Sequence, residues 1–280
     1  MRLADPVHLR SWRAELALEY ERRGPRTVLA ARRHDGPLVV QKPLYPEGDA
    51  VCHTIVVHPP AGIAGGDELE IAARAGEGAH ALLTTPGAGK WYRSAGPWAR
   101  QRLALDAGKG ACLEWLPQET IVFDGALAEM RTEVKLAADA VYIGWEVLCL
   151  GRTGSGEHYG SGECRPRTQL WRDGKPLWFE HGRIEAGGPL MGSPAGLGGR
   201  SVCGTLLAAA PGVDSEVLSA CRQAQATSGE VTVTLLPGLL VARYLGDSSE
   251  AARHYFARLW RHLRLALTGR EAVEPRIWKT

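Results

Sequence analysis

The sequence predicts a mainly β protein with two helices near the C-terminus. The chain has 34 glycines and 17 prolines, and most of them interrupt the first two hundred positions at short intervals, so few stretches there can hold a long helix. The stretches between them alternate apolar and polar residues with the period of a half-buried strand. Many short, evenly spaced strands with turn residues between them favour an all-β architecture over alternating β and α units.

The strands can be followed along the chain by this alternation. The first is predicted over residues 12–20, where every second residue from Trp12 to Tyr20 is apolar and the intervening positions are largely charged. Residues 231–245 predict two more strands on either side of Pro237-Gly238. Between these regions, similar patterns predict strands at residues 27–32, 37–42, 52–58, 68–74, 80–85, 101–107, 111–117, 132–138 and 141–150.

Two late segments carry helical spacing instead. A short helix is predicted after Pro211-Gly212, where Val217 and Cys221 are four residues apart. A longer helix follows Asp247, a candidate N-cap, and ends at Gly269. Its apolar face contains Tyr255, Phe256, Leu259, Leu263 and Leu267. Its other face carries Arg253, Arg258, Arg261 and Arg264, and we expect a solvated surface there, with a docking strip as the alternative.

Composition limits the class of protein. The chain has 280 residues and a formal charge of +2, with 33 basic and 31 acidic residues interspersed, so we expect neither a nucleic-acid partner nor a membrane-surface partner. Charged residues and proline break up the first twenty positions, and no apolar run approaches the length of a membrane span. We therefore expect a cytoplasmic protein. Without a low-complexity linker or a fixed-period repeat, one domain over residues 1–280 is expected.

The six cysteines do not indicate a disulfide framework or a zinc site. They are Cys52, Cys112, Cys149, Cys164, Cys203 and Cys221, and no two of them form a C-x-x-C pair. Reduced and mostly buried thiols are the expected state of such scattered cysteines.

The segment His53–Ser94 contains fragments of catalytic signatures, but none is complete. The Gly-Lys pair at position 90 lacks the glycine and the hydroxyl residue of a phosphate-binding loop, because Thr84 and Trp91 occupy those places. His53 and His58 differ in strand parity and therefore point to opposite faces, so they cannot hold one metal ion locally. No nucleophile elbow or zinc-binding helix motif occurs elsewhere.

Five longer blocks together resemble one known family. They are VQKPLYPEG from Val40, CHTIVVHPPAGIAGGD from Cys52, ALLTTPGAGKWYRS from Ala81, LEWLPQETIVFDGA from Leu113 and GWEVLCLGRTGSGE from Gly144. In order and spacing they are similar to the urease accessory protein family UreD, called UreH in some organisms. One departure is Ala61, where the family usually has glycine. If this position requires a positive φ, alanine there costs about 1 kcal/mol.

The resemblance implies a fold and a role. Members of the family are non-catalytic, and their strands wind into a superhelical stack of short-stranded sheets with helices near the C-terminus. The resemblance implies a scaffold, or chaperone, in a hetero-oligomeric complex that joins UreF and the GTPase UreG on apo-urease and helps deliver nickel to the urease active site. No tightly bound cofactor is implied, only nickel in transit through a passage in UreF and UreD.

Candidate residues for this passage are carboxylates, because such ligands can bind Ni²⁺ transiently. The resemblance favours Asp67, which lies in a matching block, although Gly65-Gly66-Asp67 is also typical of a hairpin turn. Glu68, Glu146 and Glu180 are further candidates because they lie in or near strands among apolar neighbours. Each of these glutamates has the alternative interpretation of an exposed carboxylate at a turn.

Tyr92 and Arg93 follow the turn at Pro86-Gly87 and are candidate interface residues, whereas Trp91 is expected to pack on the sheet. The alternative function is a metal-dependent hydrolase on a β scaffold, in which Asp67, a histidine (His53 or His58) and Glu119 would converge. Such an enzyme would hold one or two firmly bound ions, and the scaffold would not.

Overall fold

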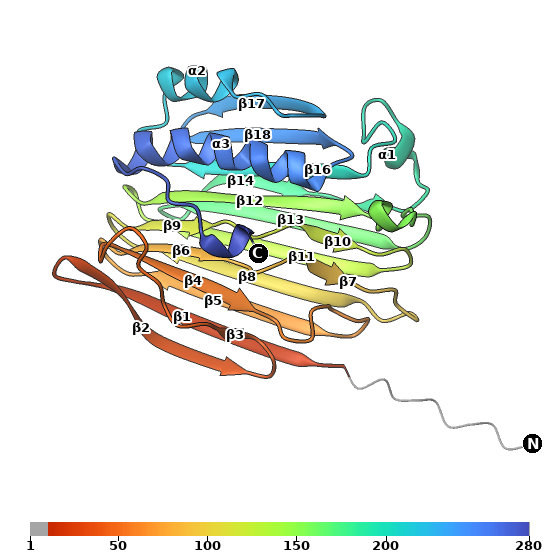
Figure 1. The fold of residues 1–280 in the computed structure, drawn as a ribbon, viewed down its shortest axis with the longest axis horizontal. Coiled ribbons are helices and arrows are strands. Elements are labelled where there is room, and N and C mark those ends of the chain that lie inside the picture. Colours follow the sequence, from red (N-terminus) through yellow and green to blue (C-terminus); the bar gives the residue numbers. More distant parts are fainter. Residues whose placement is uncertain (1–10, 280) are drawn as a thin grey trace, which may run out of the picture.

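The chain forms a β-solenoid. In the computed structural model, which describes residues 11–279, successive coils of the chain stack on one another (Figure 1). Each coil supplies one strand to each of two facing sheets, so neighbouring strands from successive coils run parallel. The expected mainly β stack is therefore confirmed, as are the two substantial helices near the C-terminus.

The first sheet has eight strands. Its spatial order is β14 (Lys175–His181), β13 (Glu163–Arg172), β11 (Leu127–Leu136), β8 (Ala99–Ala107), β5 (Glu68–Ala75), β1 (Arg13–Arg23) and β2 (Arg26–Asp35), and β15 (Ile184–Glu185) pairs with β13. The five strands from β13 to β1 are parallel, and the antiparallel strands β14 and β2 form the two edges.

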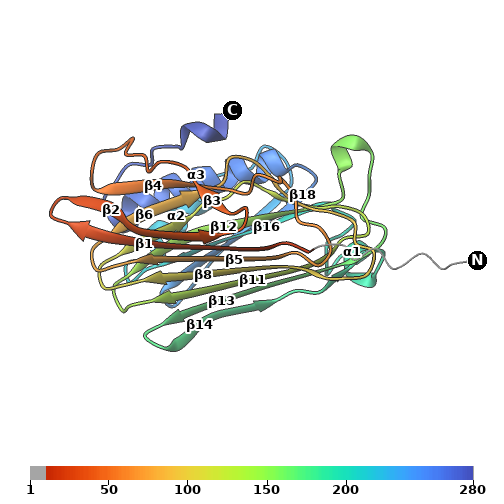
Figure 2. The same ribbon diagram turned by 90° about the horizontal axis from the view of Figure 1, so that it is seen from below.

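The second sheet has ten strands. Its spatial order is β17 (Glu230–Leu236), β18 (Leu239–Gly246), β16 (Val202–Ala209), β12 (Val141–Leu150), β9 (Cys112–Trp115), β6 (His80–Thr84), β4 (Val51–Val57) and β3 (Val39–Val40). Two short strands, β7 (Gly89–Trp91) and β10 (Thr120–Val122), pair with each other and extend the sheet beside β12. Figure 2 shows the strands of the first sheet as one layer below those of the second.

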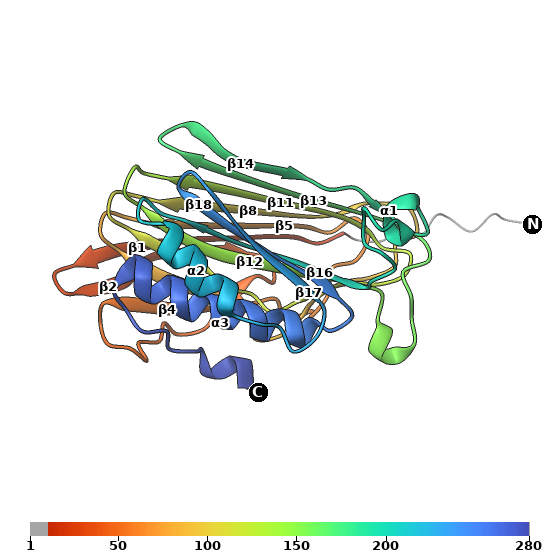
Figure 3. The same ribbon diagram turned by 90° about the horizontal axis from the view of Figure 1, so that it is seen from above.

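Three α-helices occur in the described part of the chain: α1 (Pro189–Gly192), α2 (Ser215–Gln223) and α3 (Ser249–Thr268). Two 3₁₀ turns, Thr153–Ser155 and Arg276–Lys279, complete the elements. Helices α2 and α3 cover the outer face of the second sheet, on the side away from the first sheet (Figure 3). No helix within residues 11–279 is both long enough and apolar enough to cross a membrane.

The ends of α3 differ in part from the sequence expectation. Gly269 ends the helix in the left-handed conformation with φ 66°, as predicted. The predicted N-cap, Asp247, is wrong by one residue, because the Ser248 hydroxyl accepts the hydrogen bond from the Ala251 amide. Asp247 instead pairs with Arg200 and accepts a hydrogen bond from the Ser201 amide. Asp247 therefore holds the segment at Arg200 and Ser201 in place and does not cap the helix.

Two apolar cores follow from the layering. One lies inside the solenoid between the sheets and includes the alternating residues of β1 from Ala14 to Tyr20. The other lies between the second sheet and the apolar face of α3, where Phe256 and Trp260 are fully buried. Trp12 departs from the predicted strand pattern, because it precedes β1 and is 50% exposed. Residues 1–10, which belong to the first twenty positions where charges and proline were noted above, lie outside the described residues.

All six cysteines are free, and five of them are buried, as expected. Ala61 has φ 61°, so this turn does require the conformation that glycine adopts without strain.

Three long strands, β13, β14 and β16, were not among the individual strand predictions. In β13, Pro166 interrupts the strand pattern of the sequence. On the edge side of β13, residues before Pro166 pair with β15 and residues after it pair with β14. The N–H that proline lacks therefore falls between these two pairings.

Candidate functional site

A cavity of about 870 Å³ lies between the two sheets. Most of its lining is apolar and comes from inward-facing residues such as Ile71 and Leu103 of the first sheet and Leu148 of the second. Three lining segments are exposed, at Ala61, at Gly87 and Gly89, and at Leu190 and Ala195. The cavity therefore reaches the surface and is not enclosed. A mostly apolar cavity with a few polar groups is the usual form of a binding site.

Polar residues of the second sheet enter this cavity in one row. Glu146 on β12 is the register partner of Thr205 on β16, and Thr205 is the register partner of Arg243 on β18. All three line the cavity, because the residues two positions away on each strand belong to the interior core. Three adjacent strands therefore present a carboxylate, a hydroxyl and a guanidinium side by side.

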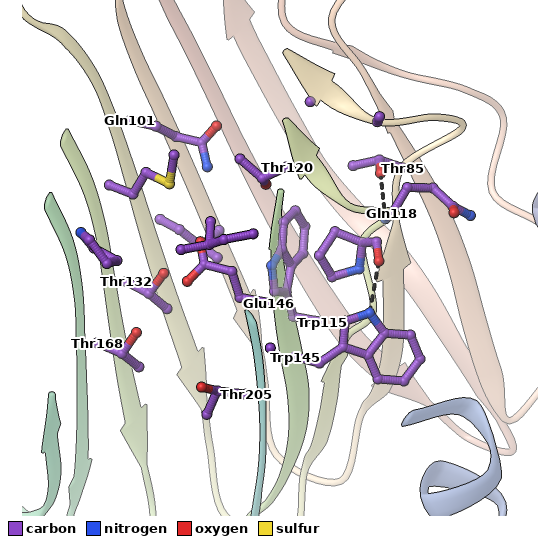
Figure 4. A pocket seen from close by; sticks show the side chains of 18 of the residues that line it. Thr85, Gln101, Trp115, Gln118, Thr120, Thr132, Trp145, Glu146, Thr168 and Thr205 are labelled. Carbon is purple, nitrogen blue, oxygen red and sulfur yellow. Dashed lines mark hydrogen bonds between the residues drawn. The ribbon is translucent and has the colours of Figure 1, made fainter. Parts of the chain in front are cut away.

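A second polar row faces the cavity from the first sheet. Thr132 on β11 pairs with Thr168 on β13, and Thr168 pairs with Glu180 on β14. Figure 4 shows the side chains of Thr132, Thr168, Thr205 and Glu146 around the same space. The two rows, called here the polar band, consist of Thr132, Thr168, Glu180, Glu146, Thr205 and Arg243.

Arg243 joins the two rows across the cavity. Its Nη1 atom donates to Glu180 Oε1 of the first sheet at 2.6 Å and to Thr205 Oγ1 of the second sheet at 2.6 Å. The guanidinium carbon also lies 5.7 Å from the centre of the Trp178 ring. One cationic side chain thus bridges the sheets at the β14–β18 end of the solenoid.

Glu146 has an unusual protonation equilibrium. Burial disfavours its charged form, and the negative charge of Glu180 adds to this effect, so the pKa of Glu146 is raised to about 7. At neutral pH the cavity therefore holds one carboxylate that is paired with Arg243 and one that is partly protonated.

The raised pKa predicts a pH-dependent effect of Glu146→Gln on stability. Because the folded protein binds this proton more tightly than the unfolded chain, wild-type stability falls as pH rises from 4.5 towards 7. We expect Glu146→Gln to leave stability near that of the wild type at pH 4.5 and to increase the free energy of unfolding by about 1–3 kcal/mol at pH 8. Urea denaturation at the two pH values checks this, and equal effects at both would contradict the assignment.

The four predicted passage residues occupy different places. Glu146 and Glu180 line the cavity, whereas Asp67 and Glu68 are not among its lining residues. The buried carboxylate of Asp67 accepts hydrogen bonds from the Ala64 amide and the Trp12 amide, each at 2.8 Å. Glu68 is exposed on the outer face of the first sheet and pairs with Arg100 at 3.3 Å.

Asp67 influences the cavity through a neighbour. His58 lines the cavity, and burial lowers the pKa of its imidazole, while the charge of Asp67 partly opposes this shift. Asp67 therefore lies near one end of the cavity without facing it. Its local contacts are those of a residue that holds the Ala64–Asp67 turn.

The candidate interface residues lie at a cluster of loops. Tyr92 is half-buried over Gly62 and contacts Phe123 edge to face, with ring centres 5.1 Å apart. Arg93 pairs with Asp124 at 2.5 Å but leaves 70% of its side chain exposed. Trp91 is buried, as expected. Arg93 is therefore the more accessible of the two candidates.

A second polar cluster lies outside the cavity, beneath α3. Within residues 11–279, His80, Cys112 and Glu114 form the one group of three possible metal ligands whose candidate atoms lie within 4.8 Å of one another. The Glu114 carboxylate, however, already accepts hydrogen bonds from His80 at 2.6 Å, Trp260 at 2.5 Å and Arg264 at 3.1 Å. The Arg264 guanidinium already supplies positive charge here, which disfavours a metal cation.

Arg264 is the clearest correction to the sequence analysis. It was expected on a solvated helix face, but it is completely buried and connects Glu114 to Glu47 through contacts of 3.1 and 2.7 Å. Burial alone would raise the pKa of Glu114, but His80 and Arg264 outweigh it and lower this pKa to about 2. The resulting stabilisation is complete above pH 4.5 and is lost as pH falls towards 2.

The residues proposed for a hydrolase do not form one site. His53 faces α3 and pairs with Glu47 at 2.5 Å, whereas His58 lines the cavity. Glu119 forms an ion pair with Arg253 at 2.8 Å, and Asp67 holds its own turn. Each candidate therefore has a different local partner. The threonines and Arg243 of the polar band were missed, because the sequence carries no signal that separates a strand residue facing a cavity from one facing solvent.

A family model and individual relatives point to the same family. A family model described as UreD urease accessory protein matches residues 13–279. A urease accessory protein UreD of Azoarcus sp. (strain BH72) is 59% identical over 269 residues, which cover 96% of this chain and 94% of the relative. The relative of the same name from Dechloromonas aromatica (strain RCB) is 57% identical, with 99% and 98% coverage. The relative from Janthinobacterium sp. (strain Marseille) is 50% identical, with 97% and 93% coverage.

Proposed function

The chain belongs to the UreD family of urease accessory proteins, and from this premise we propose that it is a non-catalytic scaffold that passes nickel through its interior cavity to apo-urease. The observation that carries this proposal is the polar band, where Glu146 and Glu180 face one cavity that reaches the surface. The carboxylate and hydroxyl oxygens of the band can bind a hydrated divalent cation one after another along a mostly apolar wall.

The chemistry of the band suits transit better than storage. Ni²⁺ is retained by imidazole and thiolate ligands in a closed site, whereas carboxylates and hydroxyls hold it more weakly. Among the described residues of the band there are two carboxylates and three hydroxyls, and one carboxylate is already paired with Arg243. Such a set can bind and release a cation without trapping it.

The partners of the scaffold are part of the same proposal. We propose that it joins UreF, and through UreF the GTPase UreG, to apo-urease in the cytoplasm. Free and mostly buried cysteines are compatible with a reducing compartment. Arg93, which is largely exposed, and Tyr92 beside it remain the candidate contacts with a partner. Asp67 would act indirectly, through its charge near His58, and Glu68 would act outside the cavity.

The proposal is tested by urease activity in cells that express the urease subunits and the remaining accessory proteins. We compare cells with and without this chain, at limiting and at excess nickel. Activity is expected to be lost without the chain and to be partly restored by excess nickel, because mass action then replaces assisted delivery. Full activity without the chain at limiting nickel would rule out the delivery role.

A further inference from the structure

The polar band contains a cation of its own. Arg243 is held at 2.6 Å from Glu180 and from Thr205, so its guanidinium occupies the place where a divalent cation would meet the Glu180 carboxylate. The contact crosses from the second sheet to the first at the β14–β18 end of the cavity. Any cation that binds Glu180 therefore competes with a side chain that is covalently part of the cavity wall.

Arg243 does not prevent a divalent cation from binding Glu180, because its ion pair with Glu180 is weak. The side chains of Arg243 and Glu180 are 41% and 32% exposed, and an ion pair at this exposure shifts an equilibrium by about fivefold or less. A partly solvated arginine can also withdraw along its flexible stem, because its aliphatic portion can pack on the apolar wall. The pair is therefore weak enough for an incoming divalent cation to break.

We propose that Arg243 is a resident cation that gates the passage: it neutralises Glu180 when the cavity is empty, yields to Ni²⁺ and then displaces the ion. This inference rests on the proposed passage and adds its regulation. Without Arg243, Glu180 and Glu146 would face the cavity together with no basic partner from the band, and two carboxylates beside three hydroxyls would hold a divalent cation longer. The arginine thus sets the cavity to transmit cations rather than retain them.

Direct binding of Ni²⁺ tests the gate. Isothermal titration with Ni²⁺ would be performed on the full-length chain, or on its complex with UreF where that complex is the soluble form. Because both competition and repulsion are removed, Arg243→Leu is expected to bind Ni²⁺ about tenfold more tightly than the wild type. Leucine adds no donor atom, so the gain comes from the Glu180 carboxylate that is freed and from the positive charge that is removed.

Two further variants make the result specific. Arg200→Leu removes an arginine that pairs with Asp247 at 2.8 Å on the surface, and its Ni²⁺ affinity should equal that of the wild type. The double variant Arg243→Leu with Glu180→Gln should lose most of the gain, because the freed carboxylate is absent. Equal or weaker Ni²⁺ binding by Arg243→Leu would overturn the gate.

Urease activation separates the gate from a structural role and from the passage itself. If Arg243 releases the ion, Arg243→Leu should activate urease poorly at limiting nickel and normally at excess nickel. An equal loss at both nickel levels would mean a structural role and would also overturn the gate. The Ni²⁺ titration tests the Arg243 gate and does not depend on the route that nickel takes. Obstructing the cavity tests only whether nickel passes through it. The gate and the passage can therefore fail independently.

Discussion

Replacing Thr168 with tryptophan is expected to reduce urease activation by at least about tenfold, because the indole would obstruct the cavity at the polar band. Thr168 lies on β13 between its register partners Thr132 and Glu180 and faces the cavity. A larger side chain that projects into existing space costs less stability than one forced into a packed core. The variant should therefore fold and still assemble with its partners, which co-purification would verify.

Two matched variants identify obstruction as the cause. Gln169→Trp places the same indole one residue later on β13, where alternation directs it to the outer face of the sheet, and it should activate urease normally. Thr168→Val keeps the volume and removes only the hydroxyl, so it should have a much smaller effect than tryptophan. Full activation by Thr168→Trp within an intact complex would show that nickel does not pass through this cavity.

Replacing Arg264 with methionine is expected to lower the free energy of unfolding by about 3–5 kcal/mol, because Glu47 and Glu114 lose the cation that pairs with them in the interior. Both carboxylates are nearly or fully buried, and Arg264 has no exposed side-chain surface. Methionine retains length and apolar contact, so the loss reports the missing charge rather than a cavity. Urea denaturation followed by tryptophan fluorescence measures the change.

The same helix supplies the control. Arg261→Met removes an ion pair with Glu274 in which the arginine is 54% exposed, and it should change stability by less than about 1 kcal/mol. Adding Glu114→Gln to Arg264→Met should recover part of the loss, since one uncompensated charge is then removed. A cost for Arg264→Met no larger than that for Arg261→Met would show that the buried network contributes little to stability.

The contrast between these two arginines shows where sequence reasoning stopped. Both lie on α3, and the helical period alone predicted a basic face for both. Arg264 is four residues from Trp260 and adjacent to Leu263, so it borders the apolar face, which was the available signal. Burial of a charge at that border depends on Glu114 and Glu47, and their proximity cannot be read from the helix sequence.

Only two of the four residues predicted to line the passage face the cavity. Glu146 and Glu180 were selected for lying among apolar neighbours, and both line the cavity. Asp67 was selected from a matching block, and its carboxylate holds a turn near the cavity. The threonines of the band have no sequence signature, because a hydroxyl on a strand is equally common on an outer face. Only the facing of two sheets around an unfilled space distinguishes them.

The sequence by itself determined the family, the mainly β class, the parity of strands such as β1 and the positions of α2 and α3. These features follow from local rules, because side chains alternate along a strand and recur every 3.6 residues along a helix. The tertiary structure alone decided that Arg243 meets Glu180 and that Arg264 meets Glu47, across 63 and 217 positions of the chain. Such contacts depend on how the coils are stacked and registered, and that registration is the sum of many weak packing interactions distributed over the whole solenoid.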